Sequence, residues 1–210
     1  MLVDAGLTFR EIVMNDPLPK GTIQQAVVDF LNGREDAAIF GAMAVNAYID
    51  ERRMTEDVDI VSPRAEELAE ELRQQLSEQF HIAVRIRTIR DGSGFRLYQL
   101  TKPKNRHLVD VRSVESLPLT ERIDGVLVVK PVEVIVGKVI SCVRRKGKPK
   151  SFTDRRDLAH MLLRFPEFKV ERGAVLDRLE ALVADEQVLN FWRELVAEDL
   201  LPEEEDDEFS

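Results

Sequence analysis

Ala38-Ile39-Phe40-Gly41-Ala42-Met43-Ala44 is the stretch of sequence that decides the fold of this chain. Ile39 and Phe40 have the apolar character of the end of a buried strand, and Gly41 supplies a turn in which the backbone can come close to a ligand. A helix is expected over residues 42–49, directly after this turn. Because the first N–H groups of a helix lack partners and lie at the positive end of its dipole, the turn is suited to hold a phosphate.

A second stretch, Arg53-Met54-Thr55-Glu56-Asp57-Val58-Asp59-Ile60, follows after the expected helix. It contains two acids, Asp57 and Asp59, which are two residues apart. In a strand this spacing directs both side chains to the same face, so the two carboxylates can share a divalent cation. Hard cations such as Mg²⁺ bind carboxylate oxygens and substrate phosphates together. The glycine turn and the acid pair are therefore complementary.

A third acid, Asp110, lies inside the apolar run His107-Leu108-Val109-Asp110-Val111, which is expected to be a strand. A carboxylate in a buried strand is costly unless its charge is met. Either Arg96 or Arg112 pairs with it in a structural role, or it completes a cation site with the first two acids. We favour the cation site, because the first two acids already imply a cation.

The rest of the chain predicts one α/β domain followed by helices. An amphipathic helix is expected over residues 65–80, strands over 82–89, 95–100 and 126–129, and helices from 131, from 153, over 171–184 and over 186–198. The expected fold class is α/β (α+β), a mixed sheet flanked by helices with a C-terminal helical bundle. The expected division is a core with an N-terminal helix over residues 1–130, a helical region over 131–200 and a disordered acidic tail over 201–210.

Length and composition predict a soluble globular protein. The chain has 210 residues, of which 44% are hydrophobic and 33% are charged, so it can bury a sizeable core. The start of the chain lacks the layout of a signal peptide, and charged residues interrupt the most apolar run, residues 126–143. We therefore expect a cytoplasmic protein without membrane association. A single cysteine, Cys142, excludes an internal disulfide, and the three histidines share no ligand spacing and are interpreted as structural.

Charge is unevenly distributed along the chain. Six of the acids behind the net charge of −9 lie in residues 203–208, so the rest of the chain is near −3. Residues 85–106 and 144–156 each contain seven basic residues and one acid. Each segment is either a solvated face or a site for a polyphosphate. No set of aromatic residues that would stack bases is evident beside them, which weakens an interpretation as a nucleic-acid surface.

The glycine turn, the Asp-x-Asp pair and the third acid on a later strand resemble the signature of the nucleotidyltransferase superfamily that includes DNA polymerase beta. Within it, the Arg-x-Thr-x-Asp-x-Asp of residues 53–59 is most similar to the AbiEii-type toxins and their small bacterial relatives. The resemblance covers about residues 38–158 and implies a polymerase-beta-like fold. It also implies the transfer of a nucleoside monophosphate from an NTP such as ATP to an acceptor hydroxyl, with release of pyrophosphate.

The resemblance further implies roles for individual residues. Asp57, Asp59 and Asp110 would be the catalytic residues and the ligands of two Mg²⁺ or Mn²⁺ ions. The residues implied to bind the nucleotide are Gly41, Ala42, Arg53, Thr55, Lys138 and Arg144, with Asp154 and Asp157 in support. These last two share a face in what is expected to be the first turn of a helix, where acids also stabilise the helix dipole. Ala42 stands where the family has Gly or Ser, a departure that bears on catalytic strength.

The sequence leaves the acceptor and two other classes of function open. The acceptor of the nucleoside monophosphate could be RNA such as a tRNA 3′ end, a protein side-chain hydroxyl or a small-molecule hydroxyl. The basic segments favour RNA. One alternative class is a nucleotide-binding domain without turnover, for which Ala42 is the clue. The other is a partner-binding component of a toxin–antitoxin pair, which predicts a complex with an antitoxin protein and is compatible with catalysis.

Overall fold

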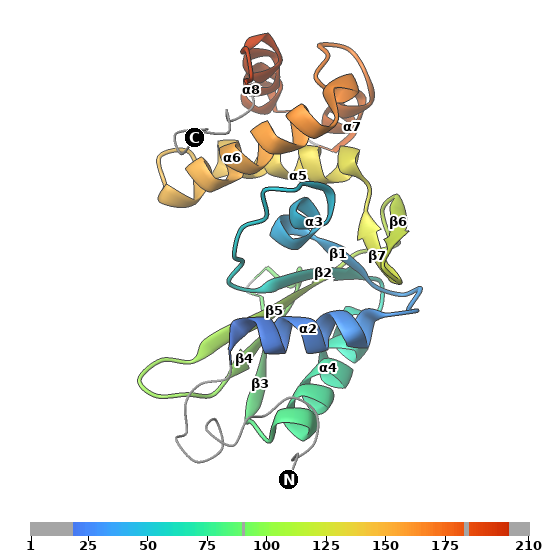
Figure 1. Cartoon of the computed structure of the whole chain (residues 1–210), viewed down its shortest axis with the longest axis vertical. Coiled ribbons are helices and arrows are strands. Elements are labelled where there is room, and N and C mark those ends of the chain that lie inside the picture. Colours follow the sequence, from blue (N-terminus) through green and yellow to red (C-terminus); the bar gives the residue numbers. More distant parts are fainter. Residues whose placement is uncertain (1–18, 90, 183–184, 202–210) are drawn as a thin grey trace, which may run out of the picture. The chain divides into compact units, whose positions relative to one another are not determined.

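The computed structural model describes residues 19–89, 91–182 and 185–201. The chain divides into two compact units: Met1–Ala47 with Arg53–Val129, and Tyr48–Arg52 with Lys130–Ser210. The sheet lies in the first unit and the C-terminal helices in the second (Figure 1). Of the predicted acidic tail, all but Leu201 lies outside the described residues. Among the helices in the described ranges, none has both the length and the apolar character that are needed to cross a bilayer.

The first unit is built on one mixed sheet, which confirms the predicted fold class. Its seven strands lie in the order β3-β4-β5-β2-β1-β7-β6. The strands are β1 (Ala38–Phe40), β2 (Val58–Ser62), β3 (Val84–Thr88), β4 (Gly94–Gln99), β5 (Arg106–Ser113), β6 (Thr120–Ile123) and β7 (Val126–Val129). The pairs β2–β5 and β1–β7 are parallel and the others antiparallel. Strand β6 was not predicted from the sequence, because it has no buried residue and therefore no apolar run to mark it.

Two helices of this unit pack on the sheet and on each other. Helix α4 (Ala65–Phe80) packs against β2, β3, β4 and β5, and α2 (Lys20–Leu31) packs against α4 and β7 (Figure 1). The apolar stripe predicted for residues 65–80 is buried along the whole of α4. Burial of such a stripe is the main source of stability for a surface helix. Helix α4 thereby covers the central strands β2 and β5.

The second unit consists of helices that surround α5 (Pro131–Arg144). These are α6 (Pro149–Arg164), the short 3₁₀ helix η1 (Pro166–Phe168), α7 (Ala174–Leu182) and α8 (Glu186–Ala197). Helix α5 packs against α6, α7 and α8, and Trp192 of α8 is fully buried. The predicted start of α6 at residue 153 was wrong. The helix begins at Pro149, because proline is well suited to the first helical position.

Candidate active site

The predicted strand, glycine turn and helix lie in the first unit. Helix α3 (Gly41–Tyr48) follows β1 without an intervening loop, and Ala42 is half-buried in its first turn. Gly41 has a φ of +68°, and a Cβ atom built on it would lie 2.2 Å from Oδ2 of Asp59. A side chain at this position would therefore collide with one of the predicted metal ligands. Glycine is required both for the left-handed backbone and for the space that Asp59 occupies.

The three predicted acids come from two neighbouring strands. Asp57 directly precedes β2, Asp59 lies within β2 and Asp110 lies within β5. These strands are parallel, and Asp59 is in register with Asp110. Residues in register on neighbouring strands present their side chains on the same face of the sheet. Asp110 is only 4% exposed, so its charge requires partners close by.

His107 joins two of these acids. Its Nδ1 lies 3.0 Å from Oδ2 of Asp57, and its Nε2 lies 2.8 Å from Oδ1 of Asp110. Burial lowers the pKa of His107, but the hydrogen bonds to Asp110 and Asp57 outweigh this effect and raise the pKa to about 10. An imidazolium therefore lies between the two carboxylates at neutral pH. The ring also stacks on Tyr98, with 5.0 Å between the ring centroids.

The closeness of His107 to Asp110 was not predicted from the sequence, and a β-bulge explains why. In a regular strand, residues three apart such as His107 and Asp110 point to opposite faces. Here Leu97 pairs with Val109 and Tyr98 with His107, so β5 has one extra residue between these pairs. A bulge of this kind reverses the alternation of faces. It brings His107 to the same side as Asp110, which no pattern within residues 107–111 indicates.

Asp110 also has a cationic neighbour on β4. Nε of Arg96 lies 3.0 Å from Oδ1 of Asp110, although its N–H is not aligned for a hydrogen bond. Of the two arginines considered in the sequence analysis, Arg96 is the ion-pair partner, whereas the Arg112 guanidinium lies 6.0 Å from the ring centroid of Phe40. The buried charge of Asp110 is thus met by two cations. This pairing is compatible with a role as a metal ligand.

The donor set fits a divalent cation. Carboxylate oxygens of Asp57 and Asp110 lie within 4.8 Å of each other and of the His107 ring nitrogens, and Asp59 is in register beside Asp110. Because a protonated His107 has no lone pair for a metal, the carboxylates are the candidate ligands. Carboxylate oxygens suit Mg²⁺ and Mn²⁺. Bound cations would also supply the positive charge that the imidazolium of His107 provides here.

The loop before β2 is held by two side chains that no sequence motif indicated. Nε2 of Gln24 on α2 donates to Oγ1 of Thr55 at 2.9 Å and to its carbonyl oxygen at 3.1 Å. Asn46 of α3 donates to the carbonyl oxygen of Arg53 at 2.7 Å and accepts from its N–H at 3.2 Å. Thr55 is 7% exposed. Thr55 and Arg53 therefore position the loop that presents Asp57, and their contacts with a nucleotide remain a prediction.

Lys138 and the two acids of α6 form a buried cluster in the second unit. Nζ of Lys138 lies 3.1 Å from Oδ1 of Asp154 and 2.6 Å from Oδ2 of Asp157. Nη1 of Arg145 lies 2.8 Å from Oδ2 of Asp154. All but Arg145 are buried. The cluster therefore joins α5 to α6, and contact of Lys138 with nucleotide phosphates remains a prediction.

One expectation about these residues needs correction, and that for Arg144 remains a prediction. Asp154 and Asp157 share a helix face as predicted, but they do not lie in the first turn, because α6 begins at Pro149. Their positions are explained by the buried ion pairs with Lys138 and not by the helix dipole. Arg144, which was also predicted to bind the nucleotide, is exposed at the end of α5.

A comparison with protein families decides the class of this chain. The model for the nucleotidyl transferase AbiEii toxin of type IV toxin–antitoxin systems matches residues 28–209. The chain belongs to the AbiEii family. It is therefore a nucleotidyltransferase, as the glycine turn, the Asp-x-Asp pair and the third acid predicted. A search of the curated proteins gave no match.

Solved structures share the fold of this AbiEii-family chain. The crystal structure of the Megavirus polyadenylate synthase matches with a TM-score of 0.58 and 14% sequence identity, covering 70% of this chain and 32% of that chain. The chain thus spans about a third of the length of that synthase. JHP933 from Helicobacter pylori matches with a TM-score of 0.51 and 15% identity over 91% of this chain and 92% of that one. At such identities the likeness shows the fold alone, which is of the polymerase-beta type.

Proposed function

We propose that this AbiEii-family chain is a metal-dependent nucleotidyltransferase that moves a nucleoside monophosphate from an NTP to an acceptor hydroxyl. The observation that supports this most directly is the meeting of acids from β2 and β5 on one face of the sheet. Asp57 and Asp110 share His107, and Asp59 lies in register beside Asp110 and against Gly41. A cluster of carboxylates beside a glycine turn and a helix start suits a cation and a polyphosphate together.

The reaction that this site would support is an in-line displacement. The acceptor oxygen forms a bond to the α-phosphorus of the NTP, the bond between this phosphorus and the α,β-bridging oxygen breaks, and pyrophosphate leaves. In this proposal Asp57, Asp59 and Asp110 would hold the ions, and Asp110 would also take the acceptor proton. A pair of Mg²⁺ or Mn²⁺ ions, when bound, stabilises the attacking and leaving oxygens.

His107 has a positioning role in this proposal. Through its two nitrogens it orients the Asp57 and Asp110 carboxylates, which come from separate strands. Its positive charge also limits their repulsion while no cation is bound. The chain is thus prepared for cation binding, because the carboxylates are already held close together.

We infer that the acceptor hydroxyl belongs to RNA and that the chain works with an antitoxin protein. The exposed basic residues at the end of α5 and the start of α6 support the first inference, since phosphates attract such groups. The family description, which names a type IV toxin–antitoxin system, supports the second. A nucleotide-binding domain without turnover is the alternative that Ala42 suggests.

The test is incubation of the purified chain with each α-labelled NTP, Mg²⁺ or Mn²⁺, and total bacterial RNA. We expect label on a discrete RNA band with the wild-type chain and loss of the label with Asp57→Asn. Glu67→Gln, which removes an exposed acid on α4, is the matched control and keeps activity. Labelling by an intact, folded Asp57→Asn protein would contradict the proposal. Measurable NTP binding without labelling would establish the alternative and make Ala42→Ser the next variant.

A further inference from the structure

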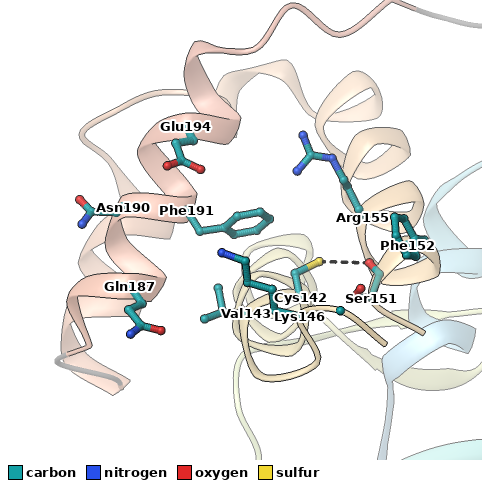
Figure 2. Close-up of a pocket in the computed structure, with 11 residues that line it drawn as sticks. Cys142, Val143, Lys146, Ser151, Phe152, Arg155, Gln187, Asn190, Phe191 and Glu194 are labelled. Atoms are coloured by element: carbon teal, nitrogen blue, oxygen red, sulfur yellow. Dashed lines mark hydrogen bonds between the residues drawn. The ribbon is translucent and has the colours of Figure 1, made fainter. Parts of the chain in front are cut away.

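A cavity of about 590 Å³ lies within the second unit, and none of the residues predicted to act in the transfer reaction is among those that line it. The end of α5, the start of α6 and one face of α8 line it (Figure 2). Pockets of this size bind small molecules or single groups of a larger ligand. The residues that line it determine which chemical class of ligand fits.

Two phenylalanines make part of the wall apolar and flat. Phe191 of α8 projects into the middle of the cavity in Figure 2, and Phe152 at the start of α6 is 72% exposed. The guanidinium of Arg155 lies 5.9 Å from the ring centroid of Phe191 and also pairs with Glu198. Rings and guanidinium planes are the groups on which unpaired bases stack.

The aromatic platform was missed in the sequence analysis. Phe191 lies far along the chain from the basic segment of residues 144–156 and was interpreted as a packing residue. The packing of α5 with α6 and α8 places it beside that segment. The basic segment of residues 144–156 therefore has aromatic residues beside it in the folded chain.

Polar groups beside the rings can recognise the edge of a base. Gln187, Asn190 and Glu194 lie on the same face of α8 as Phe191, at helical spacings of three and four residues. Amides offer both donors and acceptors, and a carboxylate accepts from an amino group such as those of adenine, cytosine and guanine. Glu194 makes the cavity unsuited to a ligand that is anionic throughout.

A cation at the rim can meet a phosphate. The side chain of Lys146 lines the cavity and is exposed, and among the residues that the structure describes no carboxylate pairs with it. Lys148 and Lys150 are exposed nearby in sequence. A ligand with a planar base at one end and a phosphate at the other fits this combination.

The cavity is suited to binding and not to covalent chemistry. Cys142, whose Sγ lies 3.8 Å from the carbonyl oxygen of Ser151, is its only thiol among the described residues. Burial raises the pKa of this thiol to about 11. It is therefore a neutral thiol at physiological pH and a poor nucleophile.

We propose that this cavity is a nucleotide-binding site, which shares no lining residue with the acid cluster at Asp57. The base stacks on Phe191 and Phe152, the amides of α8 contact its edge, and Lys146 binds its phosphate. The ligand is either a free nucleotide or one nucleotide of a single-stranded RNA, since both present the same base and phosphate. The proposal does not depend on the transfer reaction.

The test uses the full chain in EDTA, so that divalent cations do not support binding at the Asp57 site. Two probes are titrated separately: a fluorescein-labelled single-stranded octaribonucleotide by anisotropy, and free AMP, CMP, GMP and UMP by calorimetry. We expect Phe152→Ala and Asn190→Ala to weaken binding of the oligonucleotide, of a free nucleotide, or of both. For the lost stacking contact we expect an affinity loss of roughly 5- to 100-fold.

Two exposed residues elsewhere in the second unit provide matched controls. Leu182→Ala removes an apolar side chain and Arg172→Ala removes a cation, and both should leave binding unchanged. If Phe152→Ala and Asn190→Ala lose binding of the oligonucleotide alone, the ligand of the cavity is a nucleotide of single-stranded RNA. If they lose binding of a mononucleotide, the ligand is a free nucleotide. Unchanged affinity for both probes in folded Phe152→Ala and Asn190→Ala would overturn the proposal. Equally efficient displacement of the oligonucleotide by polyglutamate would also overturn it, because the surface would then bind acidic chains in general.

Discussion

At the scale of single residues, Gly41 is a position whose backbone conformation and surroundings require glycine. Gly41→Ala would place a methyl group on the Asp59 carboxylate and strain a left-handed backbone. Gly92 has a similar φ of +72°, but a Cβ atom built on it would have nothing within 4 Å, so Gly92→Ala is the matched control. We expect Gly92→Ala to lower the free energy of unfolding by about 1 kcal/mol and Gly41→Ala by about 2 kcal/mol more.

Urea denaturation of both variants checks this prediction, and the transfer assay shows whether Gly41→Ala also loses activity. Equal destabilisation by the two substitutions would mean that Asp59 moves aside at no cost. The close contact between Gly41 and Asp59 would then have no energetic importance.

His107 supports a prediction about metal removal. His107→Ala leaves the Asp57 and Asp110 carboxylates without their shared partner, so in EDTA we expect a loss of about 2 kcal/mol of stability. Added Mg²⁺ or Mn²⁺ should then raise the Tm of the variant more than that of the wild type, because the cation replaces the missing charge. Differential scanning fluorimetry measures both effects.

His81→Asn is the control for this experiment. His81 is exposed and has a positive φ at the end of α4, a conformation that asparagine tolerates. It should change neither the Tm nor its response to the cation. A metal response of His107→Ala that equals that of the wild type would contradict the positioning role.

Cys142 supports a prediction about pH. Because burial raises its pKa from 9.0 to about 11, the folded protein at pH 8 holds roughly 100-fold less thiolate than the unfolded chain. Iodoacetamide should therefore alkylate Cys142 at least roughly 100-fold more slowly in the native protein than in the urea-unfolded protein at the same pH. The alkylation rate of the native protein should rise with pH up to about pH 11. Mass spectrometry of timed samples follows the reaction. Similar rates in the native and unfolded protein would contradict the buried, neutral thiol.

At the scale of elements, the joint between α5 and α6 depends on a buried ion cluster. Lys138→Met leaves Asp154 with Arg145 alone and removes a cation from Asp157, which is fully buried. Breaking a buried pair in this way costs about 3–5 kcal/mol. Chemical denaturation should show this loss, whereas Lys150→Met at the exposed start of α6 should change stability by less than about 0.5 kcal/mol.

A second variant separates the charge effect from lost packing. Lys138→Met combined with Asp157→Asn removes one of the buried charges that the single variant leaves uncompensated. We expect the double variant to recover part of the lost stability. A single variant as mild as Lys150→Met would show that the cluster does not stabilise the joint, and would leave Lys138 available for the predicted contact with phosphates.

At the scale of the whole molecule, the chain passes between its two units more than once. Residues 48–52 belong to the helical unit, although the segments before and after them belong to the sheet unit. Tyr48 makes an edge contact with Phe165, with 5.7 Å between ring centroids and an interplanar angle of 81°. A short segment from the first third of the chain therefore contributes to the stability of the C-terminal helices.

Tyr48→Ala tests this contribution. The aromatic contact accounts for about 1 kcal/mol beyond the buried area, so the variant should exchange amide hydrogens faster in α6 and η1. Exchange in β2 and β5 should stay as in the wild type. Hydrogen exchange followed by mass spectrometry resolves the two regions. Faster exchange across the sheet as well would mean that the two units unfold together.

Short-range patterns in the sequence were enough to predict the class of fold and the main acids. The strand, glycine turn and helix at residues 38–48, the Asp-x-Asp pair and the apolar strand around Asp110 each depend on neighbouring residues and on alternation along one element. Helix α4 was predicted for the same reason. Strand β6 was missed because its residues have no such alternation of buried and exposed positions.

The sequence by itself thus determined the mixed α/β fold, the family and the placement of the three acids at strands β2 and β5, because local periodicity and motif order encode them. Only the tertiary structure decided which partners these residues have. A bulge against β4 turns His107 towards Asp110, the packing of α5 on α6 joins Lys138 to Asp154 and Asp157, and the packing of α8 places Phe191 beside the basic segment. Each of these contacts depends on an element distant in sequence, and no spacing within a single strand or helix encodes it.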